Sequence, residues 1–193
     1  MKASLMRESM RNKEICIDGE HIYLRKVRNS DVNDKYWSWM NDTEVTKLTV
    51  SRGKKYSKKE IKDYVKEKLE DDNTLFLAIV LIHNDQHIGN IKLGPIDWDL
   101  GVGDLGLIIG EKDYWGKGYG SEAIGLICRY AFEELNLKKV TAGYFAGNKG
   151  SFKAFNNNGF RITNTTQEKY PGEKDSVEVT WMALGNPKLS LKV

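Results

Sequence analysis

Three glycines at alternate positions, Gly116, Gly118 and Gly120, separate an apolar run from a stretch with helical spacing. Because glycine has no Cβ, such a loop can turn sharply and can bring its backbone N–H groups close to a ligand. The helix that follows would add the positive end of its dipole, and Lys117 would add a mobile positive charge. These residue types and this spacing predict that Gly116 to Ser121 bind a phosphate or pyrophosphate group.

Two other phosphate-binding loops share this order of strand, glycine loop and helix. A P-loop needs a lysine and then a serine or threonine after its last glycine, but Gly120 is followed by Ser121 and Glu122. The dinucleotide-binding pattern G-x-G-x-x-A is matched by Gly118, Gly120 and Ala123. That pattern also requires its first glycine directly after the strand and an acidic residue at the end of the next strand, and neither is present. The glycine match alone is weak support for a dinucleotide site.

The remaining pattern predicts the elements that would position this loop. Ser30 is a candidate N-cap for a helix over residues 31–42, and Ser57 with Glu60 forms a capping-box pattern ahead of a second helix. A third helix follows the glycine loop, and a short one is expected over 150–157. Apolar and alternating runs predict strands over residues 21–27, 74–82, 87–94, 103–110, 138–145, 160–165 and 177–184. Because helices separate some strands and hairpins join others, we expect an α/β fold of the α+β kind, with helices on both faces of a mixed sheet of about seven strands.

Composition limits the function classes. The 193 residues are 40% hydrophobic, which suits one domain over residues 15–193 behind a flexible tail of residues 1–14. The net charge of +3 comes from 30 basic and 27 acidic residues spread along the chain, which fits a small anionic ligand better than a nucleic acid. Two cysteines and three scattered histidines form no metal-binding pattern. No apolar segment is long enough for a membrane partner or a signal peptide, so we expect a cytoplasmic protein.

Two segments carry a resemblance to a known family. The segment "YWGKGYGSEA" resembles the pyrophosphate loop of the GCN5-related N-acetyltransferase (GNAT) superfamily, in the form found in the ribosomal-protein alanine acetyltransferase type. The segment "NKGSFKAFNNNGF" resembles the second signature of that superfamily, and the order of elements from His21 to Leu184 is similar as well. The resemblance implies an acetyltransferase fold with a splayed pair of parallel strands, and acetyl-CoA as co-substrate.

The resemblance also implies which residues hold the cofactor. The backbone of Leu107, Ile108 and Ile109 would pair with the pantetheine arm in the gap between the parallel strands, as an added strand does. Asn148 would hydrogen-bond the arm, or cap the following helix, or do both. Ser151 would lie near the phosphates or the thiol end. The pyrophosphate loop itself would comprise Gly116, Lys117, Gly118, Tyr119, Gly120 and Ser121.

The chemical step needs a base, a donor to the developing oxyanion and an acid for the departing sulfur. The resemblance implies a base at Asp104, where related enzymes often have a glutamate, although Asp104 could equally be a solvated turn residue. The backbone N–H near Ile108 would serve the oxyanion. Phe155 stands where many members have a tyrosine acid, and phenylalanine cannot donate a proton. Ser151, Tyr144 or water could replace that tyrosine.

The acceptor is the least specified part of the reaction. The segment "YWSWMNDTEVTKL" resembles one found in branches that act on nucleotide-linked amino sugars. We expect Trp37, Trp39, Asn41 and His87 as acceptor-binding residues. The alternative for the two tryptophans is a place in the core, and the alternative for His87 is an ordinary surface position. The expected partner is thus a small-molecule amine, and a homodimer is left open. A protein N-terminal amine is the alternative acceptor, and a regulatory acetyl-CoA-binding module without catalysis is the alternative function.

Overall fold

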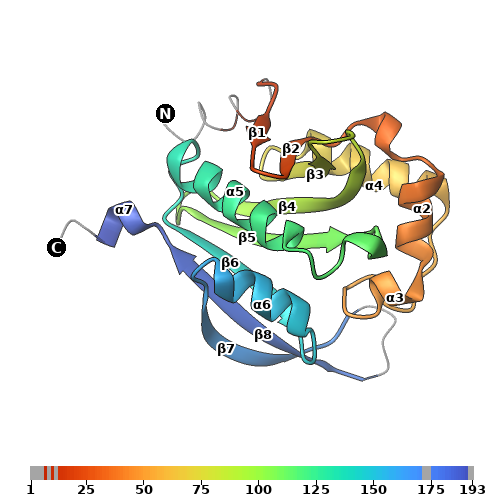
Figure 1. The fold of residues 1–193 in the computed structure, drawn as a ribbon. Helices are drawn as coiled ribbons and strands as arrows, with labels where there is room; N and C mark the ends of the chain where they lie inside the picture. Colours follow the sequence, from red (N-terminus) through yellow and green to blue (C-terminus); the bar gives the residue numbers. More distant parts are fainter. Residues whose placement is uncertain (1–6, 8–9, 11–12, 171–174, 191–193) are drawn as a thin grey trace.

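Eight strands form one mixed sheet in the order β1-β2-β3-β4-β5-β6-β8-β7 (Figure 1). The structure is a computed structural model that describes residues 7, 10, 13–170 and 175–190, so most of the expected tail over residues 1–14 lies outside the described residues. The strands are β1 (Cys16–Asp18), β2 (Ile22–Lys26), β3 (Leu75–Leu81), β4 (His87–Asp97), β5 (Val102–Ile109), β6 (Lys139–Phe145), β7 (Arg161–Glu168) and β8 (Val177–Gly185). The helices are α2 (Asp34–Asn41), α3 (Thr43–Thr46), α4 (Lys58–Glu70), α5 (Tyr119–Glu133), α6 (Lys149–Asn157) and α7 (Pro187–Ser190), with short 3-10 turns at η1 (Asn29–Asp31) and η2 (Lys112–Tyr114).

The expected single α/β domain with a mixed sheet is confirmed, with one strand more than expected. The extra strand is β1, which pairs antiparallel with β2 from Cys16 opposite Arg25 to Asp18 opposite Tyr23. A strand of three residues is too short to show an alternating pattern, so periodicity could not predict it.

The first helix begins later than expected. Ser30 lies in η1, and Asn33 caps α2 by accepting hydrogen bonds from the backbone N–H groups of Lys35 and Tyr36. Arg25 holds η1 in place, because its guanidinium donates two hydrogen bonds of 2.7 and 2.8 Å to the Asp31 carboxylate. The expected cap at Ser30 was therefore wrong by three residues. By contrast, the capping box of Ser57 and Glu60 at the start of α4 is confirmed.

Helices cover both faces of the sheet (Figure 1). On one face α5 and α6 pack against the sheet through buried residues that include Ile124, Ile127 and Phe155. On the other face α2 and α4 supply a second apolar cluster that includes Trp39 and Val65. Every residue of β3 is buried as a result. None of the helices within the described ranges is long and apolar enough to cross a bilayer.

The parallel strands β5 and β6 separate after a short pairing. They pair from Val102 opposite Lys139 to Asp104 opposite Thr141. Beyond that point β5 continues beside β4, while β6 continues beside β8 as far as Phe145. In the described chain, the edge of β5 that faces β6 thus has no strand partner after Asp104. The expected parallel pair is confirmed, and its divergence opens the middle of the sheet.

Candidate active site

A cavity of about 600 Å³ lies where β5 and β6 separate. It is bounded by β3, β4, β5, β6 and β8, by α2, by α4 and the segment before it, and by α6 with its N-cap. The predicted site residues that it brings together are Asp104, Leu107, Ile108, Asn148 and Ser151. Its walls also include aromatic residues, among them Tyr36, Tyr56, Tyr64, Tyr144, Tyr170 and Trp181. The cavity therefore joins the gap in the sheet to a space large enough for a small molecule.

Asp104 lies at the point where the strands separate. Its Oδ1 accepts a hydrogen bond of 3.0 Å from Thr141 Oγ1. Burial raises the pKa of Asp104, although the Thr141 hydrogen bond and the charge of Lys92 both act to lower it. A carboxylate with a raised pKa that lines a cavity is suited to accept a proton.

Lys92 and Asn90 are two cavity residues that the sequence reasoning missed. They occupy alternate positions on β4, and burial lowers the pKa of Lys92. Asn90 is only 3% exposed, and no described residue accepts a hydrogen bond from its Nδ2. The segment "HIGNIKLG" carried a signal for these two residues. A strand that helices cover on both faces should be apolar throughout, so the alternating polar residues in this strand indicate a polar cavity on one face.

The helix α6 and its N-cap contribute Asn148, Ser151 and Phe155 to the cavity. Asn148 Oδ1 accepts a hydrogen bond of 3.0 Å from the backbone N–H of Ser151, so Asn148 caps this helix. Phe155 is 2% exposed, and its ring packs 5.1 Å from that of Phe160. Of the hydroxyl groups that could replace the missing tyrosine, Ser151 and Tyr144 both line the cavity.

The glycine loop lies before α5 and outside the lining of this cavity. Gly116 and Gly118 have φ angles of +73° and +93°, which strongly favour glycine. A Cβ at either position would meet nothing within 4 Å, so the space beside the loop is open. Gly118 is the N-cap of α5 and provides no side-chain cap, which leaves the first N–H groups of the helix available to an anion.

The side chains of the loop mostly contact the protein. Lys117 Nζ lies 5.4 Å from the centroid of the Tyr114 ring, and the ring of Tyr119 lies 5.8 Å from the same ring. Ser121 accepts hydrogen bonds from Asn158 Nδ2 at its hydroxyl and at its carbonyl oxygen. These contacts fix the loop and join α5 to α6, so its backbone is the part that stays open to a ligand.

Glu122, in the same segment, has a role that the sequence reasoning did not assign. Its Oε1 accepts hydrogen bonds of 2.7, 2.9 and 3.3 Å from the backbone N–H groups of Glu20, His21 and Ile22. A Cβ at Gly19 would collide with this oxygen. Glu122 therefore ties the start of α5 to the start of β2.

Two of the expected acceptor-binding residues lie outside the lining of the cavity: Trp39 is in the core, and His87 is partly buried beside it. Trp39 is 3% exposed and donates a hydrogen bond of 2.7 Å from Nε1 to Glu111. His87 lies 5.0 Å from the Trp39 ring, and burial lowers its pKa. Its Nε2 lies 2.9 Å from the carbonyl oxygen of Gly89 and 3.0 Å from Oδ1 of Asn90.

The other two, Trp37 and Asn41, bind the backbone of Tyr56. Trp37 Nε1 donates to the Tyr56 carbonyl at 2.8 Å, and Asn41 both donates to that carbonyl and accepts from the Tyr56 N–H, each at 2.9 Å. Trp37 and Asn41 also lie outside the cavity lining, although Tyr56 forms part of it.

Ile109, one of the expected cofactor-binding residues, has its backbone carbonyl occupied, because Trp115 Nε1 donates a hydrogen bond of 2.7 Å to it.

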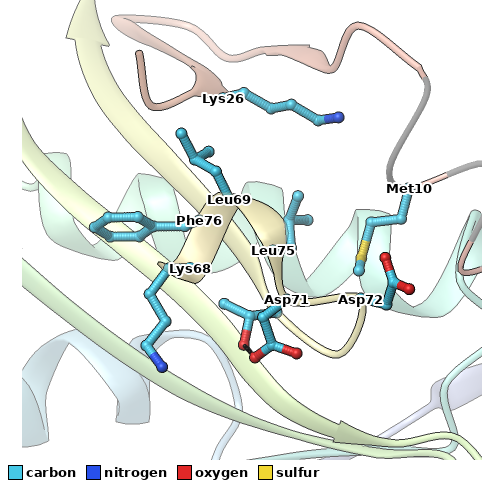
Figure 2. Close-up of a pocket in the computed structure, with 9 residues that line it drawn as sticks. Met10, Lys26, Lys68, Leu69, Asp71, Asp72, Leu75 and Phe76 are labelled. Carbon is cyan, nitrogen blue, oxygen red and sulfur yellow. Dashed lines mark hydrogen bonds between the residues drawn. The ribbon is translucent and has the colours of Figure 1, made fainter. Parts of the chain in front are cut away.

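A second cavity lies between the end of α4 and β3 (Figure 2). Its volume is about 30 Å³, which is roughly the space of one or two water molecules. Lys68, Asp71 and Thr74 are among its lining residues, and Thr74 donates a hydrogen bond of 2.7 Å to Asp71. This cavity is too small to hold an acceptor molecule.

Comparisons with known proteins agree with this geometry. Residues 21–161 match the model of the acetyltransferase (GNAT) domain. The uncharacterized N-acetyltransferase p20 of Bacillus licheniformis is 31% identical over 147 residues, which cover 74% of this chain and 80% of that protein.

Two solved structures have the same fold. A GNAT-family acetyltransferase from Bacillus anthracis superposes with a TM-score of 0.78 at 19% identity, over 89% of this chain and 99% of that one. Spermidine N-acetyltransferase from Vibrio cholerae, in complex with CoA and spermine, superposes with a TM-score of 0.77 at 18% identity, over 88% of this chain and 98% of that one. The open glycine loop and the separated strands agree with the family match. The chain therefore belongs to the GNAT acetyltransferase family and is an N-acetyltransferase that uses acetyl-CoA.

Proposed function

We propose that the acceptor is a primary amine on a small anionic molecule, and that a nucleotide-linked amino sugar is the best candidate. The observation that carries this proposal is the composition of the large cavity. Its aromatic walls, including Tyr56, Tyr64 and Trp181, offer surfaces on which a sugar or a base can stack. Lys54 and Lys92 line the cavity together with two carboxylates, Glu60 and Asp104. Because Glu60 is engaged in the capping box of α4, the two lysines support a negative charge on the acceptor.

The residues present fit acetyl-CoA. The open space at Gly116 and Gly118 and the uncapped N-terminus of α5 suit a pyrophosphate, with Lys117 nearby. The unpaired edge of β5 at Leu107 suits the amide groups of a pantetheine arm, whereas the N–H and C=O of Ile108 are turned toward β4. Asn148 uses Oδ1 as the helix cap, so its amide N–H groups would be the donors to that arm.

Acetyl-CoA, when bound, supplies the activated acetyl group. Asp104 takes the proton from the acceptor amine, directly or through one water molecule, because its carboxylate lines the cavity and its pKa is raised by burial. The residues of β5 face β4 and the gap alternately, and Gly110 N–H donates to the carbonyl of Ile88 on β4, so Ile108 also faces β4. The backbone N–H of its neighbour Leu107 therefore donates to the oxygen on which negative charge develops. Ser151, Tyr144 or a water molecule returns a proton to the departing sulfur, since Phe155 has none to give.

Two other acceptors compete with the amino sugar. Spermidine carries several positive charges, whereas the lining of this cavity sets two lysines, Lys54 and Lys92, against two carboxylates, which disfavours a second cation on the acceptor. A protein N-terminal amine is the other alternative, and a regulatory module without turnover is the alternative function from the sequence. A cytoplasmic location and a homodimer also stay predictions.

Thiol release from acetyl-CoA tests the proposal. The panel contains nucleotide-linked amino sugars, spermidine and short peptides with free N-termini, and each is assayed with the parent protein and with Asp104→Asn. We expect the highest kcat/KM with an amino sugar and a large loss in Asp104→Asn. A higher kcat/KM with spermidine or with a peptide would contradict the proposed acceptor, and acetyl-CoA binding without release on any amine would favour the regulatory module.

A further inference from the structure

Lys92 and Asn90 form a pair of hydrogen-bond donors on the cavity side of the sheet. The register places Lys92 opposite Gly106 and Asn90 opposite Ile108, while Asp104 lies two residues before Gly106 on the same strand. Because side chains alternate along a strand, all of these positions share one face. A Cβ at Gly106 would meet nothing within 4 Å, so open space separates these donors from Asp104 along β5.

The orientation of the Asn90 amide follows from its neighbour. His87 Nε2 lies 2.9 Å from the carbonyl oxygen of Gly89, which can only accept, so Nε2 carries a proton. The Asn90 atom that lies 3.0 Å from this Nε2–H is therefore the oxygen. The Asn90 NH₂ group must then be turned away from His87, and no described residue accepts its hydrogen bonds. A buried donor of this kind is costly unless a ligand or water accepts from it.

Lys92 has the same need for an acceptor. It is partly buried, it lines the cavity, and none of the described carboxylates lies within ion-pair distance of it. When Asp104 takes the proton from an amine, its own charge is lost, and Lys92 then keeps only the interactions with Asp71 and Glu67, which the charge of Lys68 opposes. A negative charge on the acceptor would compensate the charge of Lys92.

We propose that Lys92 and Asn90 together bind an anionic oxygen of the acceptor, in a carboxylate or phosphate group close to the amine that Asp104 deprotonates. This inference rests on the proposed function and refines it, because it states where on the acceptor the negative charge lies. It makes Lys92 and Asn90 specificity-determining residues: the lysine supplies charge, and the amide, fixed by His87, supplies a directed N–H.

Matched pairs of amines test the inference. Glucosamine 1-phosphate differs from glucosamine by the phosphate, and serine differs from ethanolamine by the carboxylate. Each pair is assayed by thiol release with the full chain. We expect the anionic member of at least one pair to have a kcat/KM higher by about tenfold or more, as a charged hydrogen bond implies. The pair that shows the preference identifies the anionic group as phosphate or carboxylate.

Two variants separate this role from a structural one. Lys92→Met keeps the length of the side chain without the charge, and Asn90→Asp keeps the oxygen that accepts from His87 while it replaces the NH₂ group with an acceptor. Both should abolish the preference for the anionic amine and leave the KM for acetyl-CoA unchanged. Lys62→Met, at an exposed position of α4 outside the cavity lining, is the control and should keep the preference.

The outcomes distinguish the inference from the proposed function. If amino sugars are acetylated but the phosphate or carboxylate gives no advantage, or if Lys92→Met keeps the advantage, the inference is wrong and the proposed function stands. If serine shows the preference and no amino sugar is a substrate, the proposed sugar acceptor is wrong and the inference stands. If the parent protein acetylates no member of either pair, the inference is overturned as well.

Discussion

Thr141 on β6 donates a hydrogen bond of 3.0 Å to Asp104 Oδ1 on β5, at the last residue pair that the two parallel strands share. The hydrogen bond holds the carboxylate at the point where the strands separate. Burial raises the pKa of Asp104 and the Thr141 hydroxyl moderates that rise. The pair therefore both positions the candidate base and tunes it.

Replacing the carboxylate with an amide tests the base directly. Asp104→Asn keeps the size of the side chain but cannot accept a proton, so we expect kcat to fall on the order of a hundredfold while acetyl-CoA affinity is kept. In the parent, the rate should rise with pH through an apparent pKa above the ordinary value for aspartate, because the base works only when it is deprotonated. Turnover of Asp104→Asn within a fewfold of the parent, with the same amine, would show that Asp104 is not the base.

Removing the Thr141 hydroxyl should move that pH dependence. Thr141→Val deletes a hydrogen bond that lowers the pKa of Asp104, so the pKa should rise and the rising limb of the rate profile should shift to higher pH. Thr141→Ser keeps a hydroxyl and is the matched control. Stopped assays of kcat/KM across pH measure the shift, and identical profiles for the two variants would contradict the assigned role of the hydroxyl.

Charge at the glycine loop should weaken cofactor binding. Gly118 has a φ of +93°, so any replacement adds strain, and asparagine tolerates this region better than most residues. Comparing Gly118→Asp with Gly118→Asn isolates the charge, because the two side chains have nearly the same size. We expect the aspartate variant to have a Kd for acetyl-CoA higher on the order of tenfold, measured by calorimetry. Equal Kd values would mean that the pyrophosphate does not approach this position.

Two variants of Asn148 separate its role as a helix cap from its role as a hydrogen-bond donor to acetyl-CoA. Serine caps a helix about as well as asparagine but lacks the amide N–H, whereas alanine removes both functions. We expect Asn148→Ala to lose about 1 kcal/mol of stability and Asn148→Ser to lose little. Both should raise the Kd for acetyl-CoA roughly fivefold, the equivalent of one hydrogen bond. Normal binding by Asn148→Ser would show that Asn148 is only a cap.

Glu122 should affect stability more than chemistry. Glu122→Ala would leave the backbone N–H groups of Glu20, His21 and Ile22 without their carboxylate acceptor. Because Glu20 and His21 are exposed and water can accept from them, we expect a cost of about 1–2 kcal/mol in the free energy of unfolding. Glu122→Gln keeps the accepting oxygen and should lose much less. Urea titration measures both, and an unchanged midpoint for Glu122→Ala would contradict the structural role.

Local patterns in the sequence predicted most of the fold. Alternation and helical spacing depend on which side of an element is buried, and those patterns were strong in the meander from β3 to β5 and in α4. The start of the first helix was wrong because a contact that is not a capping pattern, between Arg25 and Asp31, fixes the chain there in a turn. The three-residue strand β1 carries too little pattern to be detected.

Part of the candidate site could be predicted from the sequence, and part could not. The positive φ angles of the glycine loop and the helix cap at Asn148 could be predicted because both follow from residues adjacent in sequence, whereas the binding roles of these residues stay predictions. The placement of Lys92 against Gly106 depends on strand register, which a single sequence does not specify. Trp37 and Asn41 have types that suit ligands, yet both bind the backbone of Tyr56, a contact across the chain that residue type does not reveal.

The short pairing of β5 with β6 has a consequence for the mechanics of the domain. The sheet consists of two halves, β1 to β5 and β6 to β8, that share backbone hydrogen bonding over only a few residues. A pantetheine arm seated along the unpaired edge of β5 at Leu107 would act as the missing strand and couple the halves. Saturation at a hundredfold excess over Kd should then raise the global stability by about 2.7 kcal/mol. Amide hydrogen exchange should slow most at the edge of β5 that faces β6, so the protection of those amides would measure the occupancy of the site.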